Sequence, residues 1–332
     1  MYSVEGLSVK CMACAVPRQK FTLTEYAPDL VDGNTARQIE NVSGFHELRI
    51  APEEMTTSDL CFEAASECLV NSGNAHNIAA VVFLSQTPDY YMPATSHILQ
   101  SRLGLPSETL CIDINEGCSG FITGLYTAGI IAEESGGTVL LTGGDTMSKL
   151  TSPHDRASRT IFGDCGYAAL IDAGGNGNFP FMFGSYGERA GVLMTDNTRH
   201  RRVPDPRNEG MLFMDGAEIL KFTLADVTQF IRRFLDETGL GVNDVTLFAM
   251  HQANRLMLRM TARKLGVPGE IMPFTAGNYG NTSSASIPML LCGVHGNADM
   301  SRVMCVGFGV GLSAGACIAD FSRTKFFTVI EI

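Results

Sequence analysis

Apolar residues gather in short runs along the chain, and polar or glycine-rich sequence bounds each run. The runs that predict strands lie at residues 79–84, 109–114, 138–144, 244–250 and 301–308, and we expect these strands to be buried. Segments with helical periodicity separate them, so strands and helices alternate. This alternation predicts a layered α/β fold.

A glycine- and asparagine-rich break, DAGGNGN, occupies residues 172–178, and the same alternation resumes after Asp215. The length of 332 residues suits roughly two domain-sized units. We therefore expect two halves of similar architecture, residues 1–175 and 176–332. The most conspicuous insertion is the basic, proline-containing loop at residues 198–208.

The composition limits the function classes. A content of 45% hydrophobic and 18% charged residues is enough for a large core. A net charge of −11 disfavours nucleic acid or an anionic membrane as the main partner. The longest apolar stretch, residues 303–319, is shorter than a membrane helix and rich in glycine, so we expect no membrane insertion. The first sixteen residues do not have a signal-peptide pattern, so we expect ten reduced cysteines and a cytoplasmic protein.

Cys118 lies at a predicted strand-to-helix turn. The strand at residues 109–114 precedes it, and residues 119–137 form a helical pattern that ends in glycines. A thiol at such a turn lies beside unpaired N–H groups and the positive end of the helix dipole. We therefore expect Cys118 to ionise below the usual thiol pKa of about 8.5, as a nucleophile requires.

Two further segments carry polar side chains that suit catalysis. His251 follows the strand at residues 244–250, and Asn281 lies in the polar loop at residues 276–288. The glycines of residues 307–315 allow the backbone to approach a ligand closely. Taken singly, a cysteine at a turn usually packs in the core, and a histidine or asparagine in a loop usually caps local structure. The phrases GCSGF, HQAN and GNTSSAS, in this order, are far more specific together.

These phrases resemble the β-ketoacyl-acyl carrier protein synthase III family of condensing enzymes in the thiolase superfamily. The resemblance covers the whole chain. It includes residues 9–17, 43–54, 92–104, 155–171 and 263–266 and ends in the glycine loop near Gly311. It implies a thiolase-like α/β fold, in which two similar halves form a five-layered α-β-α-β-α arrangement, and usually a homodimer.

The resemblance also implies a mechanism. Cys118 would take an acyl group from a thioester, and the backbone N–H groups of Cys118 and Val310 would form the oxyanion hole. His251 and Asn281 would stabilise the enolate formed when malonyl-acyl carrier protein loses carbon dioxide. That carbanion attacks the acyl group and gives a 3-oxoacyl-acyl carrier protein. No metal and no permanently bound cofactor are implied; the substrates are acyl-coenzyme A or acyl-carrier protein, and malonyl-acyl carrier protein.

Further positions match binding residues of the family. Those matched to coenzyme A or pantetheine are Arg156, Gly216, Ala253 and Asn254; those matched to the pocket are Phe162, Phe308 and, from a neighbouring subunit, Met92; those proposed for carrier-protein docking are Lys221, Arg255, Arg259, Arg263 and Lys264. Arg199, Arg201 and Arg202 are added candidates for phosphate contact.

The chain departs from the family at the nucleotide end. The family commonly has a tryptophan just before the region matched by Gln38 and an arginine at the position of Val42, whereas this chain has no tryptophan. Coenzyme A and a carrier protein therefore both remain open as the acyl donor. Two other functions remain open as well: an acyltransferase that passes the acyl group to a hydroxyl or amine, and a non-catalytic partner subunit of a synthase.

Three further features have simpler explanations. Cys11 and Cys14 have the spacing of a zinc pair, but without a second pair we expect them to pack in the core. The phrase GVGLSA, which begins at Gly309, resembles a dinucleotide fingerprint, but too few residues follow for the rest of that unit. The negative charge of Glu116 is favourable at the start of a helix, and the role of this residue in the chemistry stays open.

Overall fold

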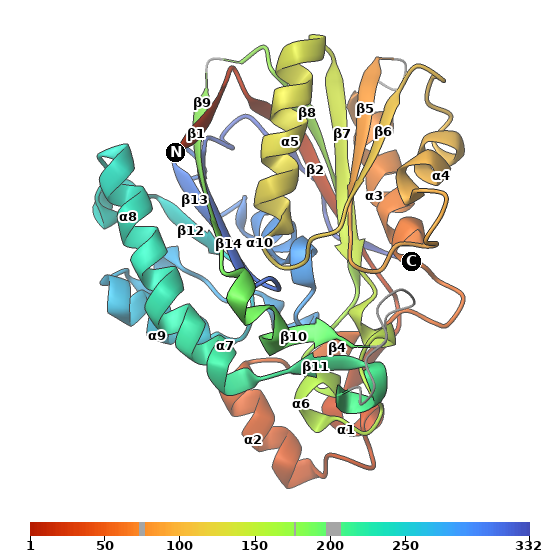
Figure 1. The fold of residues 1–332 in the computed structure, drawn as a ribbon, viewed down its shortest axis with the longest axis vertical. Coiled ribbons are helices and arrows are strands. Elements are labelled where there is room, and N and C mark those ends of the chain that lie inside the picture. Colours follow the sequence, from red (N-terminus) through yellow and green to blue (C-terminus); the bar gives the residue numbers. More distant parts are fainter. Residues whose placement is uncertain (73–76, 176, 197–206) are drawn as a thin grey trace.

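Two β-sheets alternate with layers of helices in the computed structural model, which describes residues 1–72, 77–175, 177–196 and 207–332 (Figure 1). The order in the first sheet is β1 (Tyr2–Glu5), β9 (Asn178–Ser185), β14 (Ser313–Ala319), β13 (Val303–Gly309), β12 (Leu247–Met250). The order in the second is β15 (Lys325–Phe326), β2 (Ser8–Val16), β8 (Cys165–Asp172), β7 (Thr138–Asp145), β5 (Ile78–Leu84), β6 (Leu110–Ile114), and β16 (Ile330–Glu331) also pairs with β2.

The two sheets repeat one pairing pattern. In the second sheet β5 and β7 are parallel, and β8 and β2 follow as antiparallel neighbours. In the first sheet β12 and β13 are parallel, and β14 and β9 follow in the same way. This repetition agrees with the expected duplication. The division at residue 175 stays a prediction, since β1 joins the first sheet while β15 and β16 join the second.

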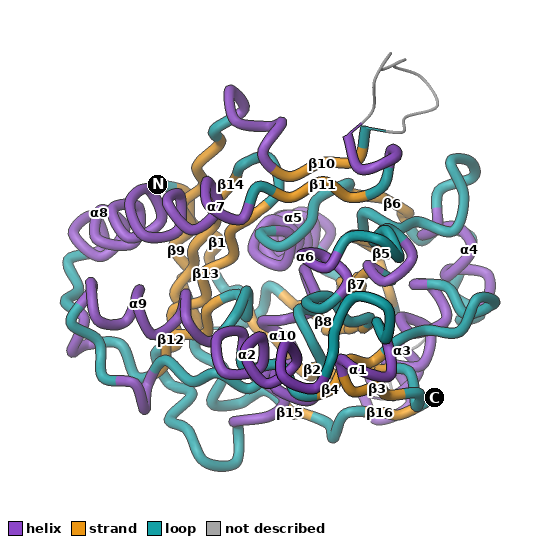
Figure 2. Tube along the Cα trace, turned by 90° about the horizontal axis from the view of Figure 1, so that it is seen from below, coloured by secondary structure: helices purple, strands orange, loops and turns teal. Residues whose placement is uncertain are grey.

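Helices cover both faces of each sheet, so the described residues form the expected five layers (Figures 1 and 2). Helices α5 (Gly120–Ser135) and α10 (Ser286–Val294) lie between the sheets, and their apolar residues belong to the central core. Helices α3 (Thr57–Ser72) and α4 (Thr95–Arg102) pack on the second sheet, while α8 (Thr228–Thr238) and α9 (Arg255–Leu265) pack on the first.

The remaining short elements gather at one end of the molecule, below the sheets in Figure 1. They are α1 (Leu23–Tyr26), α2 (Gly33–Ser43), α6 (Arg156–Arg159) and α7 (Gly216–Phe222), with the strand pairs β3 (Lys20–Thr22) and β4 (Glu47–Arg49), and β10 (Leu193–Thr195) and β11 (Leu212–Met214).

The five predicted strands are confirmed as β5, β6, β7, β12 and β13, and the helix predicted after Cys118 is confirmed as α5. The expectation of burial was wrong for β6. Among the described residues β6 pairs with β5 alone, so it forms a sheet edge, and Leu110 is 50% exposed. The GVGLSA phrase forms the turn between antiparallel β13 and β14.

The cysteine pair and the long apolar stretch belong to the core. Cys11 and Cys14 are buried free thiols in β2, as expected. Residues 303–319 form β13, a turn and β14. Across the residues that the structure describes, no helix has the length and apolar character needed to cross a bilayer.

Candidate active site

Cys118 occupies the turn between β6 and α5, and glycine backbone surrounds it. β6 ends at Ile114 and α5 begins at Gly120, as the sequence pattern predicts. The end of β13 approaches closely: a Cβ atom added at Gly309 would lie 2.8 Å from Cys118 Cβ and 3.1 Å from its Sγ. Only glycine at position 309 leaves room for the thiol.

Cys118 is 6% exposed, and its burial governs its ionisation. Burial raises the pKa of the thiol to about 12, although the hydroxyl of Ser283 and the backbone groups of Cys118 and Val310 act in the lowering direction. The expected lowering by the helix start was therefore wrong, because loss of hydration destabilises the thiolate more than these donors stabilise it. Cys118 therefore rests as a thiol and would have to lose its proton to act as the predicted nucleophile.

His251 follows β12 and faces the same region. Its Nδ1 atom lies 2.7 Å from Ser286 Oγ, and its ring packs edge-on against Phe308 with 5.3 Å between centroids. Burial lowers the pKa of His251 to about 3, and a backbone hydrogen bond with Ser283 opposes this shift. The imidazole is therefore neutral at physiological pH, with one nitrogen as donor and the other as acceptor.

Asn281 is held by backbone contacts on both sides. Its N–H donates to the Ile161 carbonyl at 2.8 Å, and its own carbonyl accepts from the Gly163 N–H at 3.1 Å. Its side-chain oxygen accepts from the Ser283 N–H at 3.0 Å, a bond in which the amide NH₂ group takes no part. The side chain thus has a fixed orientation and keeps a donor for a ligand.

Ser283 brings the three predicted catalytic residues together. Its hydroxyl lies 3.8 Å from Cys118 Sγ, its N–H binds the side chain of Asn281, and its backbone bonds to His251. Its φ of 51° is in the left-handed region, which a serine adopts at a cost. The sequence reasoning missed Ser283; the only signal was its place in the phrase GNTSSAS.

Asp145 supports the same loop from the end of β7. It is fully buried, and its Oδ1 accepts from the Gln86 N–H at 2.7 Å and from Ser85 Oγ at 3.1 Å. Its Oδ2 accepts from Ser284 Oγ at 3.5 Å. Burial raises the pKa of this carboxyl to about 6. The sequence reasoning missed Asp145 too, although a charged residue at the end of a buried strand was a visible signal.

Comparisons with known proteins identify the family. Residues 112–187 match the family model described as 3-oxoacyl-[acyl-carrier-protein] synthase III, and residues 235–321 match the model of its C-terminal part. The β-ketoacyl-[acyl-carrier-protein] synthase III of Lactobacillus delbrueckii subsp. bulgaricus is 34% identical over 284 residues, which cover 84% of this chain and 88% of that one. The chain belongs to the β-ketoacyl-[acyl-carrier-protein] synthase III family.

Other relatives agree over nearly the whole length. Synthase III 2 of Halalkalibacterium halodurans is 30% identical, with 95% of this chain and 97% of that protein covered. The crystal structure of 3-oxoacyl-(acyl-carrier protein) synthase from Burkholderia xenovorans LB400 has a TM-score of 0.93 at 31% identity, with coverage of 100% and 98%. This ketosynthase III is thus a condensing enzyme with the thiolase fold, as the sequence predicted.

The pocket residues predicted for the ketosynthase lie in different places. Phe162 is 3% exposed and pairs through its backbone with Asn281, while Phe308 is 2% exposed against His251. Met92 is 83% exposed.

The predicted pantetheine residues lie on three short segments. Arg156 is exposed at the start of α6, and Gly216 begins α7, where an added Cβ would meet nothing within 4 Å. Ala253 is half-buried between β12 and α9. Asn254 caps α9 by accepting from the Met257 N–H at 2.8 Å, which engages its amide oxygen.

Arg255 joins α9 to α2. Its Nη2 donates to the carbonyl oxygens of Glu40 at 3.1 Å and Asn41 at 2.9 Å, near the C-terminal end of α2. The Glu40 carbonyl also accepts from the Gly44 N–H at 2.8 Å. These contacts give Arg255 a structural role, and its role in docking stays a prediction.

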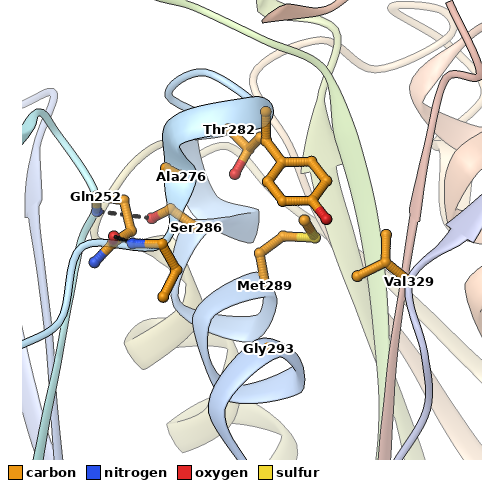
Figure 3. A pocket seen from close by; sticks show the side chains of 9 residues that line it. Gln252, Ala276, Thr282, Ser286, Met289, Gly293 and Val329 are labelled. Carbon is orange, nitrogen blue, oxygen red and sulfur yellow. Dashed lines mark hydrogen bonds between the residues drawn. The ribbon is translucent and has the colours of Figure 1, made fainter. Parts of the chain in front are cut away.

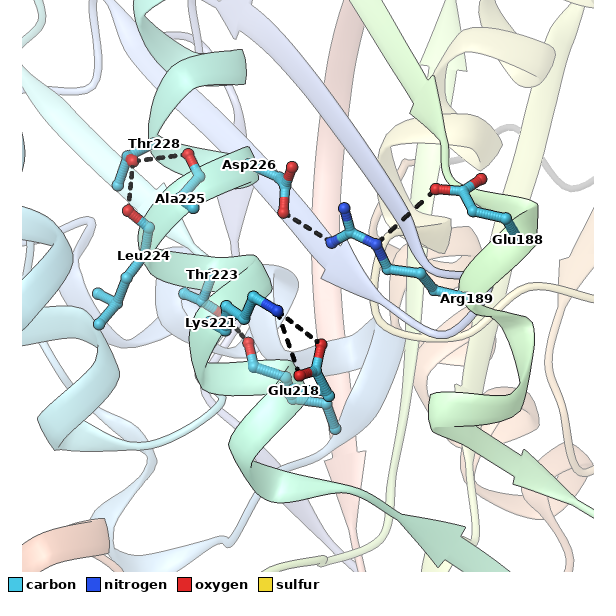
Figure 4. A network of polar contacts seen from close by, with 10 residues as sticks. Glu188, Arg189, Glu218, Lys221, Thr223, Leu224, Ala225, Asp226 and Thr228 are labelled. Carbon is cyan, nitrogen blue, oxygen red and sulfur yellow. Dashed lines mark hydrogen bonds and ion pairs between the residues drawn. The ribbon is translucent and has the colours of Figure 1, made fainter.

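Two other predicted docking cations also have partners. Lys221 pairs with Glu218 at 3.3 Å, and nearby Arg189 pairs with Asp226 at 2.7 Å (Figure 4). Lys264 donates to the Leu224 carbonyl at 2.7 Å. The first contact lies within α7, whereas the other two join segments that are far apart in the sequence.

Arg259 and Arg263 keep their charges free on α9. Both are exposed, and within the described part of the chain neither has a partner. Leu256 and Met260 lie on the same helix and are 39% and 38% exposed. With spacings of three and four residues, these four side chains share one face that is both basic and apolar.

Glu116 anchors the helix start. Ser119 Oγ donates to Glu116 Oε1 at 2.6 Å and lies 2.7 Å from Ser313 Oγ, which donates to the Val310 carbonyl at 2.6 Å. This chain of contacts joins the Cys118 turn to the glycine loop.

In the described ranges, no three His, Cys, Asp or Glu side chains are grouped to hold a metal ion. The three arginines predicted in the loop at 198–208 lie outside the described residues.

Proposed function

We propose that this enzyme takes an acyl group from a thioester onto Cys118 and condenses it with malonyl-acyl carrier protein. The proposal rests on one observation: Cys118, His251 and Asn281 each contact Ser283. The backbone groups of Cys118 and Val310 both act on the sulfur, which supports the assignment of their N–H groups to the oxyanion hole.

The second step uses two neutral donors. A neutral His251 ring N–H and the free amide group of Asn281 donate to the malonyl thioester oxygen, which gains negative charge as carbon dioxide leaves. Their stabilisation is strong because both groups are buried in a site of low dielectric constant. The resulting carbanion attacks the acyl group and gives the 3-oxoacyl-acyl carrier protein.

The partner proposed for α9 is an acidic carrier protein. Arg259 and Arg263 supply positive charge, and the exposed Leu256 and Met260 supply apolar contact between them.

For the acyl donor, the exposed Gln38 and Val42 on α2 offer neither an aromatic ring nor a cation to a nucleotide. Their chemistry favours a carrier-bound donor over coenzyme A.

A second copy of the chain is proposed at the edge strand β6. An edge strand presents unpaired backbone groups that pair readily with another chain. Leu110 on this strand is 50% exposed, and Tyr90 and Met92 in the preceding segment are 62% and 83% exposed. A homodimer through this edge would bury them and carry Met92 toward the other copy's pocket.

The cytoplasm is the compartment proposed, in keeping with ten free thiols.

Intact-protein mass spectrometry tests the proposal. The enzyme is incubated with acyl-coenzyme A and acyl-carrier donors and then with malonyl-carrier protein. Cys118→Ala should take up no acyl mass, whereas Cys111→Ala, which removes a half-buried thiol on β6, should load like the native enzyme. Discharge of the acyl mass into a 3-oxoacyl product supports condensation.

Two outcomes contradict the proposal. Discharge only by a hydroxyl or amine acceptor would make the protein an acyltransferase. Absence of loading from a broad donor panel would make it a non-catalytic partner subunit.

A further inference from the structure

A cavity of about 220 Å³ lies between the loop that carries Asn281 and the C-terminal segment of the chain (Figure 3). Its lining consists of Gln252, Thr275, Ala276, Tyr279, Thr282, Ser286, Met289, Gly293 and Val329. Ser286 and Thr282 at one end are 1% and 2% exposed, whereas Gly293 is exposed. The cavity therefore runs from buried residues beside the active site to the molecular surface.

The chemistry of the lining suits water. The hydroxyl groups of Thr275, Tyr279 and Thr282 make no hydrogen bond to any described protein group. Thr282 is buried, and Thr275 and Tyr279 are partly buried. Buried polar groups normally have partners, and a cavity of this volume holds several water molecules at about 30 Å³ each. Water in the cavity would satisfy all three groups.

Ser286 joins this cavity to the active site. Its hydroxyl lines the cavity, lies 2.7 Å from His251 Nδ1 and accepts from the Gln252 N–H at 3.4 Å (Figure 3). His251 and Cys118 both contact Ser283, so the cavity, His251 and Cys118 lie close to one another.

The condensation that we propose for this enzyme consumes a proton. The electrons of the bond to the malonyl carboxylate form the new carbon–carbon bond, carbon dioxide leaves, and the bond between the acyl carbon and Cys118 Sγ breaks. The sulfur leaves as a thiolate. Because burial raises the pKa of Cys118 to about 12, the resting enzyme holds a thiol and must take up one proton in each turnover.

We propose that water in this cavity supplies that proton through Ser286 and His251. A cavity water donates to Ser286 Oγ, the hydroxyl proton passes to His251 Nδ1, and the proton on His251 Nε2 passes to the sulfur of Cys118. The ring changes tautomer and stays neutral throughout, in keeping with the burial that lowers the pKa of His251 to about 3. Acyl loading runs the relay in reverse: Cys118 gives its proton to Nε2, and the Nδ1 proton returns to the cavity. The bond between the acyl carbon and the donor's sulfur breaks in this step, and the donor leaves as a thiolate that takes its proton from solvent.

A single-turnover experiment separates bond formation from proton uptake. Enzyme loaded with an acyl group on Cys118 is mixed with malonyl-carrier protein in weak buffer that contains a pH indicator. Proton uptake is followed by stopped flow before carbon dioxide hydrates, and 3-oxoacyl product is measured by rapid quench. Ser286→Ala removes the relaying hydroxyl, and Ser286→Thr keeps one.

A second pair of variants tests the cavity itself. Gly293→Leu narrows the exposed mouth of the cavity without contact to His251. Gly293→Ala is its matched control, since an added Cβ at this position meets nothing within 4 Å. If Ser286→Ala fails to fold, the Gly293 pair decides the outcome alone.

The native enzyme, Ser286→Thr and Gly293→Ala should take up one proton together with each product formed. In Ser286→Ala and Gly293→Leu, proton uptake should lag behind product by at least about tenfold. If proton uptake keeps pace with product formation in both of these variants, the proposal is overturned. The proton would then enter through the substrate entrance. Absence of 3-oxoacyl product from the loaded native enzyme would instead refute the proposed function.

Discussion

Replacement of Asp145 by asparagine should change how the stability of the enzyme depends on pH. Burial raises the pKa of this carboxyl from 3.8 to about 6 in the folded protein. The folded state therefore binds the proton more tightly than the unfolded chain. The stabilisation by the neutral acid is fully present below pH 3.8 and is lost as the pH rises through 6. About two pH units at about 1.4 kcal/mol each give a total loss of about 3 kcal/mol.

Asparagine stays neutral at every pH and keeps the shape of the side chain. Its oxygen can accept from the Gln86 N–H, and its NH₂ group can donate to Ser284 Oγ, which are the neighbours of Asp145. The free energy of unfolding of Asp145→Asn minus that of the native enzyme should therefore rise by roughly 1–2 kcal/mol between pH 5 and pH 7.5. Above pH 7.5 this difference should level off.

Urea unfolding at several pH values and one fixed protein concentration measures this difference. The exposed Asp29→Asn provides a control for the loss of one negative charge. A difference that stays flat or falls between pH 5 and pH 7.5 would refute the reasoning. It would mean that the Ser85, Gln86 and Ser284 donors hold the carboxylate in its charged form despite burial.

Four further outcomes follow from the site. Alkylation of Cys118 by iodoacetamide in the free enzyme should keep rising with pH beyond 9, because burial raises the pKa of this thiol to about 12; a plateau near 8.5 would contradict this. The rate of condensation should show no histidine titration between pH 5 and pH 8, since the pKa of His251 is lowered to about 3. If enzyme already loaded on Cys118 still showed a change in this rate centred near pH 6.5, that result would count against the prediction. Arg255→Ala should lower the free energy of unfolding by about 1–3 kcal/mol, because the Asn41 carbonyl loses its donor and the Glu40 carbonyl loses one of two, and leave the KM for carrier protein within about twofold. Arg259→Glu should do the opposite, raising that KM at least about tenfold without loss of stability, and equal effects of both variants on KM would show that the docking face is assigned wrongly.

Much of the fold could be predicted because hydrophobic periodicity is a local property. The strand and helix around Cys118 follow from apolar spacing within a few residues of it, and so does the strand before His251. The burial of β6 could not be predicted in this way. A strand is buried or exposed according to how many neighbours its sheet provides, and β6 has one neighbour among the described residues.

The residues proposed for catalysis, Cys118, His251 and Asn281, also came from the sequence, through the motifs around them. The contacts that support these residues could not be predicted. Ser283 and Asp145 act on Cys118 from segments far away in the sequence, and the contact of Arg255 with α2 joins residues more than two hundred positions apart.

Local sequence therefore settled the layered α/β architecture, the position of the nucleophile at a strand-to-helix turn and the residue types of the site. Tertiary packing alone decided their protonation. A helix start favours a thiolate, but packing between two sheets removes the water that would hydrate it, and the loss of hydration dominates for both Cys118 and His251. The cavity behind Ser286 likewise exists only because three segments, at Gln252, residues 275–293 and Val329, leave space between them.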